Sequence, residues 1–512
     1  MIAILHNKNR VIGVFDYDLN EEIEIEKDSL VAIFFSLAER FENRIIIWCN
    51  YLLRDKINFD EIGKLFNHKL IMASYNVGKS YYIDKRIGYV EASPYTIVNK
   101  EVKYPTWLMS SNIGAINSDV LLAYNINDYK NRSFEYVLNS IAKNGLAKGL
   151  FCYSSPSIIK KTDEISLNES KTSFYTLYVF IKEHYRLRWV FISFFNSLVY
   201  EKRFMLLPLL LSVLTSKKVR KPKFVYGIKE SKSFNPDVSI DVIIPTIGRK
   251  TYLYDVLRDL SHQTIKPKNV IIIEQNPDKG TESELSYLYD ESWPFKIKHE
   301  FIHKSGACNA RNKALQQVKS DWVFLADDDI RFEENTIKLA LQEMHIYHLN
   351  AATLQCLRKG DKKNKQPTLQ WNTFGSGCSI ISKKIAKSVK FDEAFEHGFG
   401  EDGDYGMQIR NLGEDIGYIS MCTLLHLKAP VGGFRTKFVN SWANDKVQPK
   451  PSPTIMLYNI KHQSKYQIRG YKTILFFKFF KRQNNKNVFT YYFKLKKQWK
   501  KSIELAYRLK KQ

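Results

Sequence analysis

The stretch HKSGACNARNKALQQVKSDWVFLADDDIRF (residues 303–332) predicts a helix over 307–320 and a buried strand over 321–329. The strand ends in three adjacent aspartates, which repel one another and prefer water or a cation to a protein interior. They form either a solvated loop whose acids favour the next helix start, or a site where oxygen ligands bind a divalent cation. The surrounding sequence is needed to choose between these interpretations.

The sequence before this stretch alternates strands with helices. SIDVIIPTIGRKTYLYDVLRDLSHQ (239–263) predicts a buried strand, a loop marked by proline and glycine, and an amphipathic helix; NVIIIEQNPDKG (269–280) predicts a second strand. Such alternation implies parallel pairing in a doubly wound α/β sheet. Ligands bind at the carboxyl ends of the strands in such sheets, and the three aspartates follow a strand at that end.

Residues 1–215 repeat this rhythm, with a helix over 28–41 and strands over 44–49 and 69–76. Two pairs of stretches also resemble each other: TWLMSSNIGAINSDVL (106–121) with QWNTFGSGCSIISKKI (370–385), and SFEYVLNSIAKNG (133–145) with GEDGDYGMQIRNLG (400–413). We interpret the first region as a degenerate internal copy. It should be noncatalytic, because its third strand ends in Asn76 without an acidic cluster, and Tyr136 stands where the second stretch has its acid.

The basic, turn-rich segment SKKVRKPKFVYGIKESKSFNPD separates the two copies. The sequence therefore predicts four parts: a noncatalytic domain over 1–215, a linker over 216–237, a catalytic domain over 238–440, and a basic, aromatic helical tail over 441–512.

The chain carries 78 Lys and Arg against 53 Asp and Glu, a net charge of +25. This excess predicts an acidic partner such as nucleic acid, an anionic membrane surface or a phosphorylated substrate. The positive charge is concentrated in the linker and the tail, with hydrophobic residues between, which is not typical of a nucleic-acid recognition fold. A noncatalytic nucleic-acid-binding or scaffold protein remains the alternative interpretation, but no nucleic-acid partner is expected.

Two apolar runs, WVFISFFNSLVY (189–200) and FMLLPLLLSVL (204–214), are bordered by basic residues, and the tail has a similar mixture. Neither run reaches the roughly eighteen apolar residues of a membrane-spanning helix. They fit either helices in a membrane interface or core helices with a solvated basic face. The N-terminus lacks the pattern of a signal peptide and the six cysteines show no CxxC spacing, so a cytoplasmic protein, peripheral on the membrane, is expected.

Two further groups carry candidate chemistry. FDEAFEHGFGEDGDYGMQIRNLG (391–413) places Glu401 and Asp402 in a glycine-rich loop at a helix start. A carboxylate there can act as a general base, or it can simply stabilise the helix dipole. His426 ends an apolar run in TLLHLKAPVGGFR (423–435); a lone histidine is usually structural, but beside metal-binding aspartates it becomes a plausible third ligand.

The ordered set DVIIPTIGR, HQT, SGACNARNKAL, ADDD, FGSGCSII and GEDGDYGMQIR, over roughly 240–430, resembles family-2 inverting glycosyltransferases with the GT-A fold. The resemblance implies an enzyme that uses Mn²⁺ or Mg²⁺ and a nucleotide-diphospho-sugar donor. It makes Asp327 and Asp329 metal ligands with His426, Asp402 the catalytic base, and Glu401 its neighbour.

The resemblance also implies a donor site at the ends of the strands. The residues it assigns to that site are Pro245, Thr246, Arg249, Gln275, Asn276, Arg311, Asn312, Asp327, Asp328 and Gly377. One departure concerns IEQNPDKG (273–280), where many members carry an Asp-Asp-Gly-Ser stretch whose aspartate contacts the base. An amide at Gln275 or Asn276 can donate and accept, so both UDP- and dTDP-sugars are expected donors.

The implied reaction is a single displacement in which Asp402 takes a proton from an acceptor hydroxyl as it attacks the anomeric carbon from the opposite face. The basic, aromatic tail favours a lipid-linked saccharide acceptor at an anionic membrane surface, as in cell-surface polysaccharide assembly.

Overall fold

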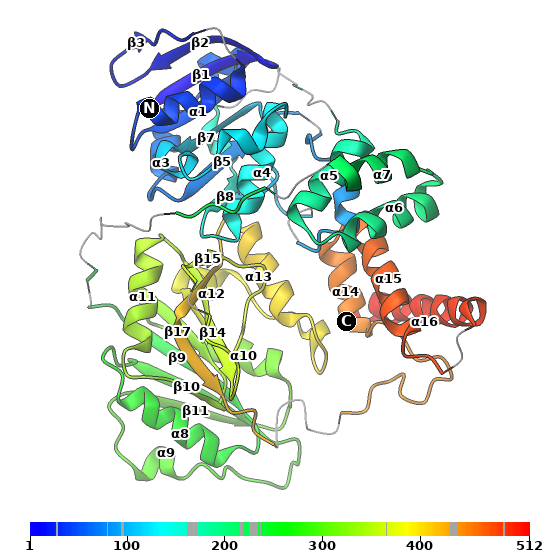
Figure 1. Ribbon diagram of the computed structural model, residues 1–512. Helices are drawn as coiled ribbons and strands as arrows, with labels where there is room; N and C mark the ends of the chain where they lie inside the picture. The colour runs from blue at the N-terminus through cyan, green and yellow to red at the C-terminus, as the bar shows by residue number, and fades with distance from the viewer. Residues whose placement is uncertain are drawn as a thin grey trace. The chain divides into compact units, whose positions relative to one another are not determined.

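The computed structural model forms two compact units (Figure 1). The first comprises Met1–Lys229 and Gln463–Phe479, and the second Glu230–His462 and Phe480–Gln512. The structure describes residues 1–26, 29–78, 80–93, 97–160, 167, 171–215, 219–224, 234–235, 237–364, 366–430, 438–484 and 487–511. Most of the predicted linker lies outside these residues, and the predicted tail is divided between the two units.

The second unit contains a mixed sheet in the order β11-β10-β9-β12-β16-β14-β17-β13, with β15 paired to β17. The strands are β9 (Ile240–Thr246), β10 (Asn269–Gln275), β11 (Lys296–Ile302), β12 (Trp322–Ala326), β13 (Ile330–Arg331), β14 (Ala351–Arg358), β15 (Leu369–Gln370), β16 (Cys378–Ser382) and β17 (Gly417–His426). The pairing is parallel from β11 to β12, and β16 then runs antiparallel to both of its neighbours.

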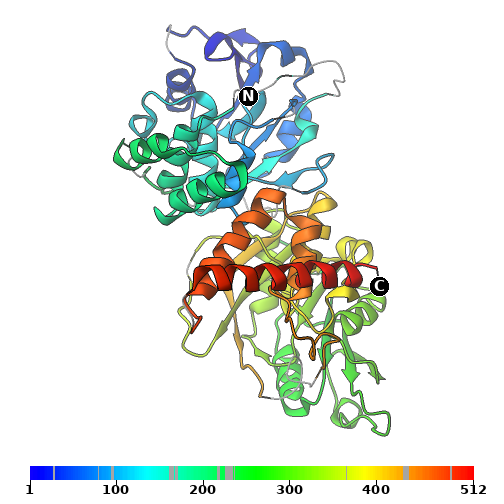
Figure 2. The ribbon, with the colours of Figure 1, turned by 90° about the vertical axis from the view of Figure 1, so that its right-hand side faces the viewer.

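Some helices of this unit contact the sheet and others pack on helices. Strands of the sheet are contacted by α8 (Lys250–Ser261), α10 (Ala307–Gln316), α11 (Thr336–Ile346) and α12 (Lys383–Ser388). The unit also contains α9 (Tyr287–Asp290), α13 (Glu401–Asn411), which packs on α14 (Pro453–His462), and α16 (Val488–Leu509). In α8 the buried residues Leu253, Val256, Leu257 and Leu260 follow the spacing of one helix face. The helix α16 packs on α14 (Figure 2).

The strand β11 was not predicted, so β12 is the fourth strand of the parallel part and not the third. Its sequence KIKHEFI carries charge at every second residue and is only half-buried. It is an edge strand with one neighbour, β10, and such a strand needs no continuous hydrophobic run. The charged residues of β11 therefore break the apolar pattern by which a strand is predicted, and the turn residues around it do not indicate one.

The first unit contains a sheet in the order β3-β2-β1-β4-β7-β5-β8-β6. The strands are β1 (Ile2–Asn7), β2 (Arg10–Asp16), β3 (Glu21–Glu22), β4 (Ile45–Asn50), β5 (Ile71–Tyr75), β6 (Tyr104–Pro105), β7 (Ile113–Asn117) and β8 (Phe151–Ser154). The helices are α1 (Leu30–Arg40), α2 (Phe59–Leu65), α3 (Ser118–Leu121), α4 (Phe134–Leu146), α5 (Phe174–His184), α6 (Arg188–Glu201), α7 (Leu206–Thr215) and α15 (Lys465–Phe480). Short 3-10 turns cover Tyr51–Lys56, Lys85–Tyr89, Ile126–Tyr129, Pro156–Ile158 and, in the second unit, Glu393–Phe395.

The two sheets share one topology over five strands. In the series β1-β4-β7-β5-β8 the successive pairings are parallel, antiparallel, antiparallel and parallel, and the series β9-β12-β16-β14-β17 has the same pairings. In both series the fourth strand along the chain lies between the second and the third. This confirms the predicted α/β class with two tandem copies. The copies differ beyond β1, where the antiparallel strands β2 and β3 stand in place of the parallel strands β10 and β11.

Candidate functional site

The three aspartates follow β12 at the edge of the sheet where β9 and β17 also end. The backbone N–H of Asp327 donates to Gly377 O at 3.0 Å, which joins this loop to the turn before β16. A Cβ on Gly377 would lie 2.0 Å from Asp327 Oδ2. A larger residue at position 377 would therefore displace the Asp327 carboxylate.

Asp327 and Asp328 each accept a hydrogen bond from an arginine. Arg311, on α10, donates to Asp327 Oδ1 at 3.0 Å. Arg249, at the start of α8, donates to Asp328 Oδ1 at 2.6 Å, and Thr246 Oγ1 donates to its other oxygen at 2.7 Å. Burial raises the pKa of Asp328 to about 6 against the opposing pull of Arg249. Both oxygens of Asp328 are thus engaged by the protein itself.

Asp329 faces His426, which ends β17. The His426 Nε2 and Asp329 Oδ1 atoms are 3.3 Å apart, and the Ala429 N–H donates to Asp329 Oδ2 at 2.8 Å. Burial opposes ionisation of Asp329, but these hydrogen bonds outweigh it and lower the pKa of the carboxyl group. The same contact raises the pKa of His426.

One potential ligand atom from each of Asp327, Asp329 and His426 lies within 4.8 Å of the other two. Two carboxylates and an imidazole form a donor set that suits Mn²⁺, and carboxylates also suit Mg²⁺. The residues present therefore fit a divalent cation. Arg249 and Arg311 offset the negative charges of the three adjacent aspartates, and a bound cation would offset them further.

A second pair of carboxylates lies at the start of α13, after Gly400, whose φ is +115°. Asp402 Oδ1 accepts the Ser376 N–H at 3.2 Å. Burial, and next the charge of Asp402, raise the pKa of Glu401 to about 7. Burial also raises the pKa of Asp402. Glu401 Oε2 is buried and has no hydrogen-bond partner among the described residues.

Arg311 connects the two carboxylate groups electrostatically. Its side chain is buried, and the charges of Asp327, Asp402 and Glu401 all favour its protonated form. A buried cation between two sets of carboxylates offsets their mutual repulsion. The structure thus brings together Thr246, Arg249, Arg311, the three aspartates, Gly377, Glu401, Asp402 and His426.

The remaining predicted residues have local partners. Gln275 Oε1 accepts the Gly306 N–H at 2.6 Å, and Asn276 Oδ1 accepts the Asp278 N–H at 3.1 Å. Asn312 bonds the backbone of Phe391 through both its oxygen and its nitrogen, each at 2.8 Å. Pro245 lies half-buried next to the end of β9. The structure does not bring the Asn312 amide to the carboxylates.

Sequence reasoning missed two residues that shape this region. Glu396 accepts the backbone N–H groups of Cys308 and Asn309 at 3.1 and 3.0 Å, and so caps the start of α10. Asp404, fully buried on α13, contacts Lys461 and His462 of α14 at 2.5 and 2.7 Å. Both are acids of the stretch 391–413, whose many acids indicate a functional region. Their partners are distant in the sequence, so the contacts themselves could not be predicted.

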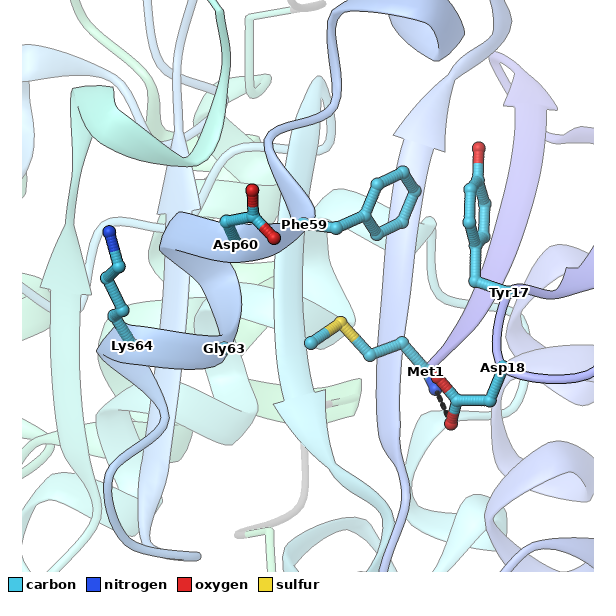
Figure 3. A pocket seen from close by; sticks show the side chains of 7 residues that line it. All are labelled: Met1, Tyr17, Asp18, Phe59, Asp60, Gly63 and Lys64. Atoms are coloured by element: carbon cyan, nitrogen blue, oxygen red, sulfur yellow. Dashed lines mark hydrogen bonds and ion pairs between the residues drawn. The ribbon is translucent and has the colours of Figure 1, made fainter.

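A pocket in the first unit contains none of the predicted residues (Figure 3). Its lining residues are Met1, Tyr17, Asp18, Phe59, Asp60, Gly63 and Lys64. The Met1 amino group contacts Asp18 at 2.6 Å and the Tyr17 and Phe59 rings lie 3.6 Å apart. Lys64 also forms an ion pair, with Glu61 at 2.7 Å.

No helix among the described residues has both the length and the apolar character needed to cross a membrane.

Residues 241–411, about a third of the chain, match the model of the family described as "Glycosyl transferase family 2". Two curated proteins are similar to parts of the chain. The GalNAc(5)-diNAcBac-PP-undecaprenol beta-1,3-glucosyltransferase of Campylobacter jejuni is 21% identical over 30% of this chain and 55% of that protein. The minor teichoic acid biosynthesis protein GgaB of Bacillus subtilis is 30% identical over 22% of this chain and 12% of that protein. The chain thus spans about half the length of the first relative and much less of the second.

Two solved structures are similar to parts of the chain at low scores. S. aureus TarS 1–349 in complex with UDP-GlcNAc has a TM-score of 0.37 at 18% identity, over 52% of this chain and 79% of that 1–349 chain. GalNAc-T7 with UDP, GalNAc and Mn²⁺ has a TM-score of 0.36 at 12% identity, over 47% of this chain and 51% of that chain.

Proposed function

Since residues 241–411 form a glycosyl transferase family 2 domain, we propose that the chain is an inverting glycosyltransferase. It moves a sugar from a nucleotide-diphospho-sugar to a saccharide hydroxyl. The observation that carries this proposal is the pairing of two carboxylate groups around buried Arg311: Asp327 and Asp329 with His426 on one side, Glu401 and Asp402 on the other. A transferase needs one group for the leaving diphosphate and one for the acceptor proton.

Asp327, Asp329 and His426 would hold the cation, Mn²⁺ or Mg²⁺. When bound, such a cation neutralises charge on the departing diphosphate. Asp328 supports the site without joining it, because Thr246 and Arg249 occupy its oxygens. Arg249 thereby holds the start of α8 against the aspartate loop.

The donor nucleotide would lie at the carboxyl ends of β9 and β12, with Pro245 and Thr246 against the nucleoside. Arg311 contributes a buried positive charge for the diphosphate. Gln275 and Asn276 stand at the end of β10 and supply amides for the base, which suits uracil and thymine alike. Asn312 positions the segment at Phe391 through its two backbone hydrogen bonds. UDP- and dTDP-sugars are the donors to test.

Asp402 would accept the proton of the acceptor hydroxyl as the oxygen attacks the anomeric carbon from the face opposite the leaving group. Its pKa is raised by burial, which makes the carboxylate a stronger base than an exposed aspartate. Glu401 orients the acceptor hydroxyl through its buried, unshared Oε2 atom, for which the described residues offer no partner. The attack on one face and departure from the other invert the configuration.

The acceptor we propose is a lipid-linked saccharide at the cytoplasmic face of a membrane, in cell-surface polysaccharide assembly. The names of the two curated relatives support this acceptor class, because one acts on an undecaprenol-linked saccharide and the other belongs to teichoic acid biosynthesis.

A donor screen tests the proposal. The purified full chain is incubated with UDP-, dTDP- and GDP-sugars in Mn²⁺ or Mg²⁺, and release of the nucleotide diphosphate is measured. We expect turnover of a UDP- or dTDP-sugar that excess EDTA abolishes. Full activity in EDTA would contradict the metal assignment, and no turnover of any donor, with or without saccharide acceptors, would contradict the proposed reaction.

A matched pair of variants separates the metal site from the fold. Asp329→Asn removes one proposed ligand, whereas Asp321→Asn changes an exposed acid at the opposite end of β12, where Asp321 bonds Ser239. Asp329→Asn should lose Mn²⁺ binding in calorimetry together with turnover, and Asp321→Asn should keep both. Equal Mn²⁺ affinity in the two variants would remove Asp329 from the ligand set.

A further inference from the structure

The helix α6 presents large apolar side chains to solvent on one face. Leu187, Phe191, Phe195 and Val199 are spaced four residues apart and are all exposed. Residues at this spacing lie above one another on a helix. They therefore form a continuous apolar stripe along the whole of α6.

The helix α7 continues this surface. Its exposed residues are Leu206, Leu207, Leu210, Leu211 and Leu214, and exposed Phe204 precedes the helix. Leu207 and Leu214 are 67% and 80% exposed. In the same unit, exposed Phe477 of α15 contacts Phe195 with ring centroids 5.6 Å apart. We call this set of exposed side chains on α6 and α7, with Phe204 and Phe477, the outer apolar face.

The sides of α6 and α7 that face the protein carry buried polar side chains beside core residues such as Val190 and Leu209. In α6 the buried residues include Ser193, Asn196 and Ser197, and in α7 Ser212 is fully buried. Asn196 Oδ1 accepts a hydrogen bond from Thr473 at 2.6 Å, and Ser212 Oγ donates to Leu209 O at 2.7 Å. An ordinary surface helix carries its apolar stripe on the core side alone, whereas α6 and α7 carry a second apolar stripe on the outer side.

The outer stripe decides between the two interpretations that the sequence left open for these runs. A core helix with a solvated basic face would expose charged residues on its outer side, whereas the outer side of α6 and α7 exposes most of their leucines and two phenylalanines of α6. Contiguous exposed apolar surfaces of this kind mark interaction sites in soluble proteins, because each leucine moved out of water stabilises the bound state.

The charge around the outer apolar face identifies its partner. From Arg186 to Lys223 the sequence has nine Lys and Arg and one acid, Glu201. Arg186 and Arg188 at the start of α6, and Lys202 and Arg203 at its end, are exposed. Two copies of such a face would bring like charges together, whereas an anionic lipid surface offers the opposite charge.

We propose that the outer apolar face of α6 and α7 docks the protein on an anionic lipid bilayer. The helices would lie in the plane of the interface, since α6 has 14 residues and α7 has 10, too few to span it. Leucine and phenylalanine side chains enter the acyl region, and the flanking arginines and lysines meet lipid phosphates. The inference rests on the proposed function only in that a lipid-linked acceptor requires the enzyme at a membrane.

The test measures the partition coefficient of the full chain on vesicles of phosphatidylcholine with and without phosphatidylglycerol. The test variant is Leu207→Gln with Leu214→Gln, and Leu207→Ile with Leu214→Ile keeps the apolar surface. The matched control is Leu52→Gln, a 61% exposed leucine in the same unit but outside the outer apolar face.

We expect the wild type to bind vesicles that contain phosphatidylglycerol, less strongly at high salt. The double glutamine variant should lose roughly tenfold in partition coefficient per leucine, and the isoleucine variant and Leu52→Gln should bind as the wild type does. Equal binding of the double glutamine variant, or no binding of the wild type to any vesicle, would overturn the proposal.

Two further measurements, the oligomeric state and donor hydrolysis, distinguish the remaining outcomes. A wild-type dimer that the glutamine variant converts to a monomer, without vesicle binding, would assign the face to a second copy of the chain and overturn the lipid proposal. Donor hydrolysis in detergent-free buffer should be unchanged in the glutamine variant, because these leucines lie outside the candidate site. Failure of the donor screen would therefore refute the proposed reaction and leave the vesicle result standing.

Discussion

Glu401 and Asp402 are neighbours on the first turn of α13, yet their surroundings differ. Asp402 accepts the Ser376 N–H, which fixes its orientation, and Glu401 carries a buried oxygen without a partner among the described residues. A general base contributes about 10²- to 10⁴-fold to the rate. A fixed carboxylate suits that role, and an unshared one suits binding of the acceptor.

We therefore expect Asp402→Asn to lower kcat by about 10²- to 10⁴-fold with donor affinity nearly unchanged. Glu401→Gln should lower kcat less and raise the KM for the acceptor. Steady-state kinetics of both variants, with donor titration by calorimetry, measure the difference. If Asp402→Asn keeps most of its kcat while Glu401→Gln loses it, the base is Glu401.

The pKa of Glu401 also predicts a pH dependence of stability. Burial and the Asp402 charge raise it from an ordinary value near 4.5 to about 7. The folded state therefore binds a proton that the unfolded state has lost between these values, and the free energy of unfolding falls as pH rises through this window. Glu401→Gln should stabilise the metal-free protein by roughly 1–3 kcal/mol at pH 8 and have little effect at pH 4. Urea unfolding at both pH values gives the comparison, and a difference that does not change with pH would refute this account.

At the residue scale, the site residues that could be predicted from the sequence were those that follow or end apolar runs. Asp327, Asp329 and His426 are separated by up to 99 positions, yet each ends or follows a strand, and strand ends meet at one edge of a parallel sheet. The hydrogen-bond partners of the amide side chains could not be predicted. Asn312, for example, bonds the backbone of Phe391, 79 residues away. Hydrogen bonds to backbone groups leave no residue pattern in the sequence.

At the element scale, α13 is held in place by α14. Asp404 is fully buried and contacts both Lys461 and His462. Burial opposes its ionisation, but hydrogen bonds from His462 and Lys461 outweigh it and lower the pKa of the Asp404 carboxyl group. The helix that carries Glu401 and Asp402 is therefore fixed by charges at its first turn.

Asp404→Asn should lower the free energy of unfolding by about 3 kcal/mol, because it removes the fully buried carboxylate that pairs with the Lys461 ammonium group and the His462 ring. Its contribution is present above the unfolded pKa near 4 and is lost as pH falls through the lower folded value, so variant and wild type should converge in acid. Asp392→Asn is the control, since the partly exposed Asp392–Lys461 pair contributes about 1 kcal/mol or less. Denaturant unfolding at pH 7 and pH 3 measures both. An equal loss in the two variants at pH 7 would contradict the anchoring role of Asp404.

Elements with a strong period were predictable from the sequence, and those defined by pairing partners were not. The buried runs of β9, β10 and β12 and the amphipathic α8 are formed where expected. The edge strand β11 was missed because its charges suited a loop. Leu412, three residues after buried Ile409, is exposed at the end of α13, and Gly413, at φ +85°, follows that end.

At the scale of the whole molecule, the shared topology shows which residues of the first unit stand where the second unit has its aspartates. The Asn50 N–H donates to Asn112 O as the Asp327 N–H donates to Gly377 O. This places Asn50, Tyr51 and Leu52 at the positions of the three aspartates. The acids are thus missing at the end of β4, and not at Asn76 after β5 as the sequence indicated. The strands β2 and β3 also replace the strands that would flank a donor nucleotide.

One acid of the first unit does stand at the counterpart of Asp402, where the sequence pattern wrongly placed Tyr136. Ser111 Oγ lies 3.5 Å from Glu135 Oε1, and Ser111 and Ser376 each stand one residue before the paired positions Asn112 and Gly377. Glu135, on the first turn of α4 as Asp402 is on that of α13, is therefore the counterpart of Asp402. Tyr136 instead points into the core and contacts Glu183.

We propose that this remaining carboxylate takes no part in glycosyl transfer, because the described residues place no cluster of metal-binding acids beside it and β2 and β3 stand where the donor-binding strands would be. Glu135→Gln in the full chain should keep turnover within about twofold, while Asp402→Asn loses about 10²- to 10⁴-fold. The full chain is required, since α15 packs in the first unit and a fragment ending at residue 215 would lack it. Circular dichroism and thermal melting confirm that each variant is folded. A folded Glu135→Gln protein with turnover as low as that of Asp402→Asn would show that the first unit contributes to the chemistry.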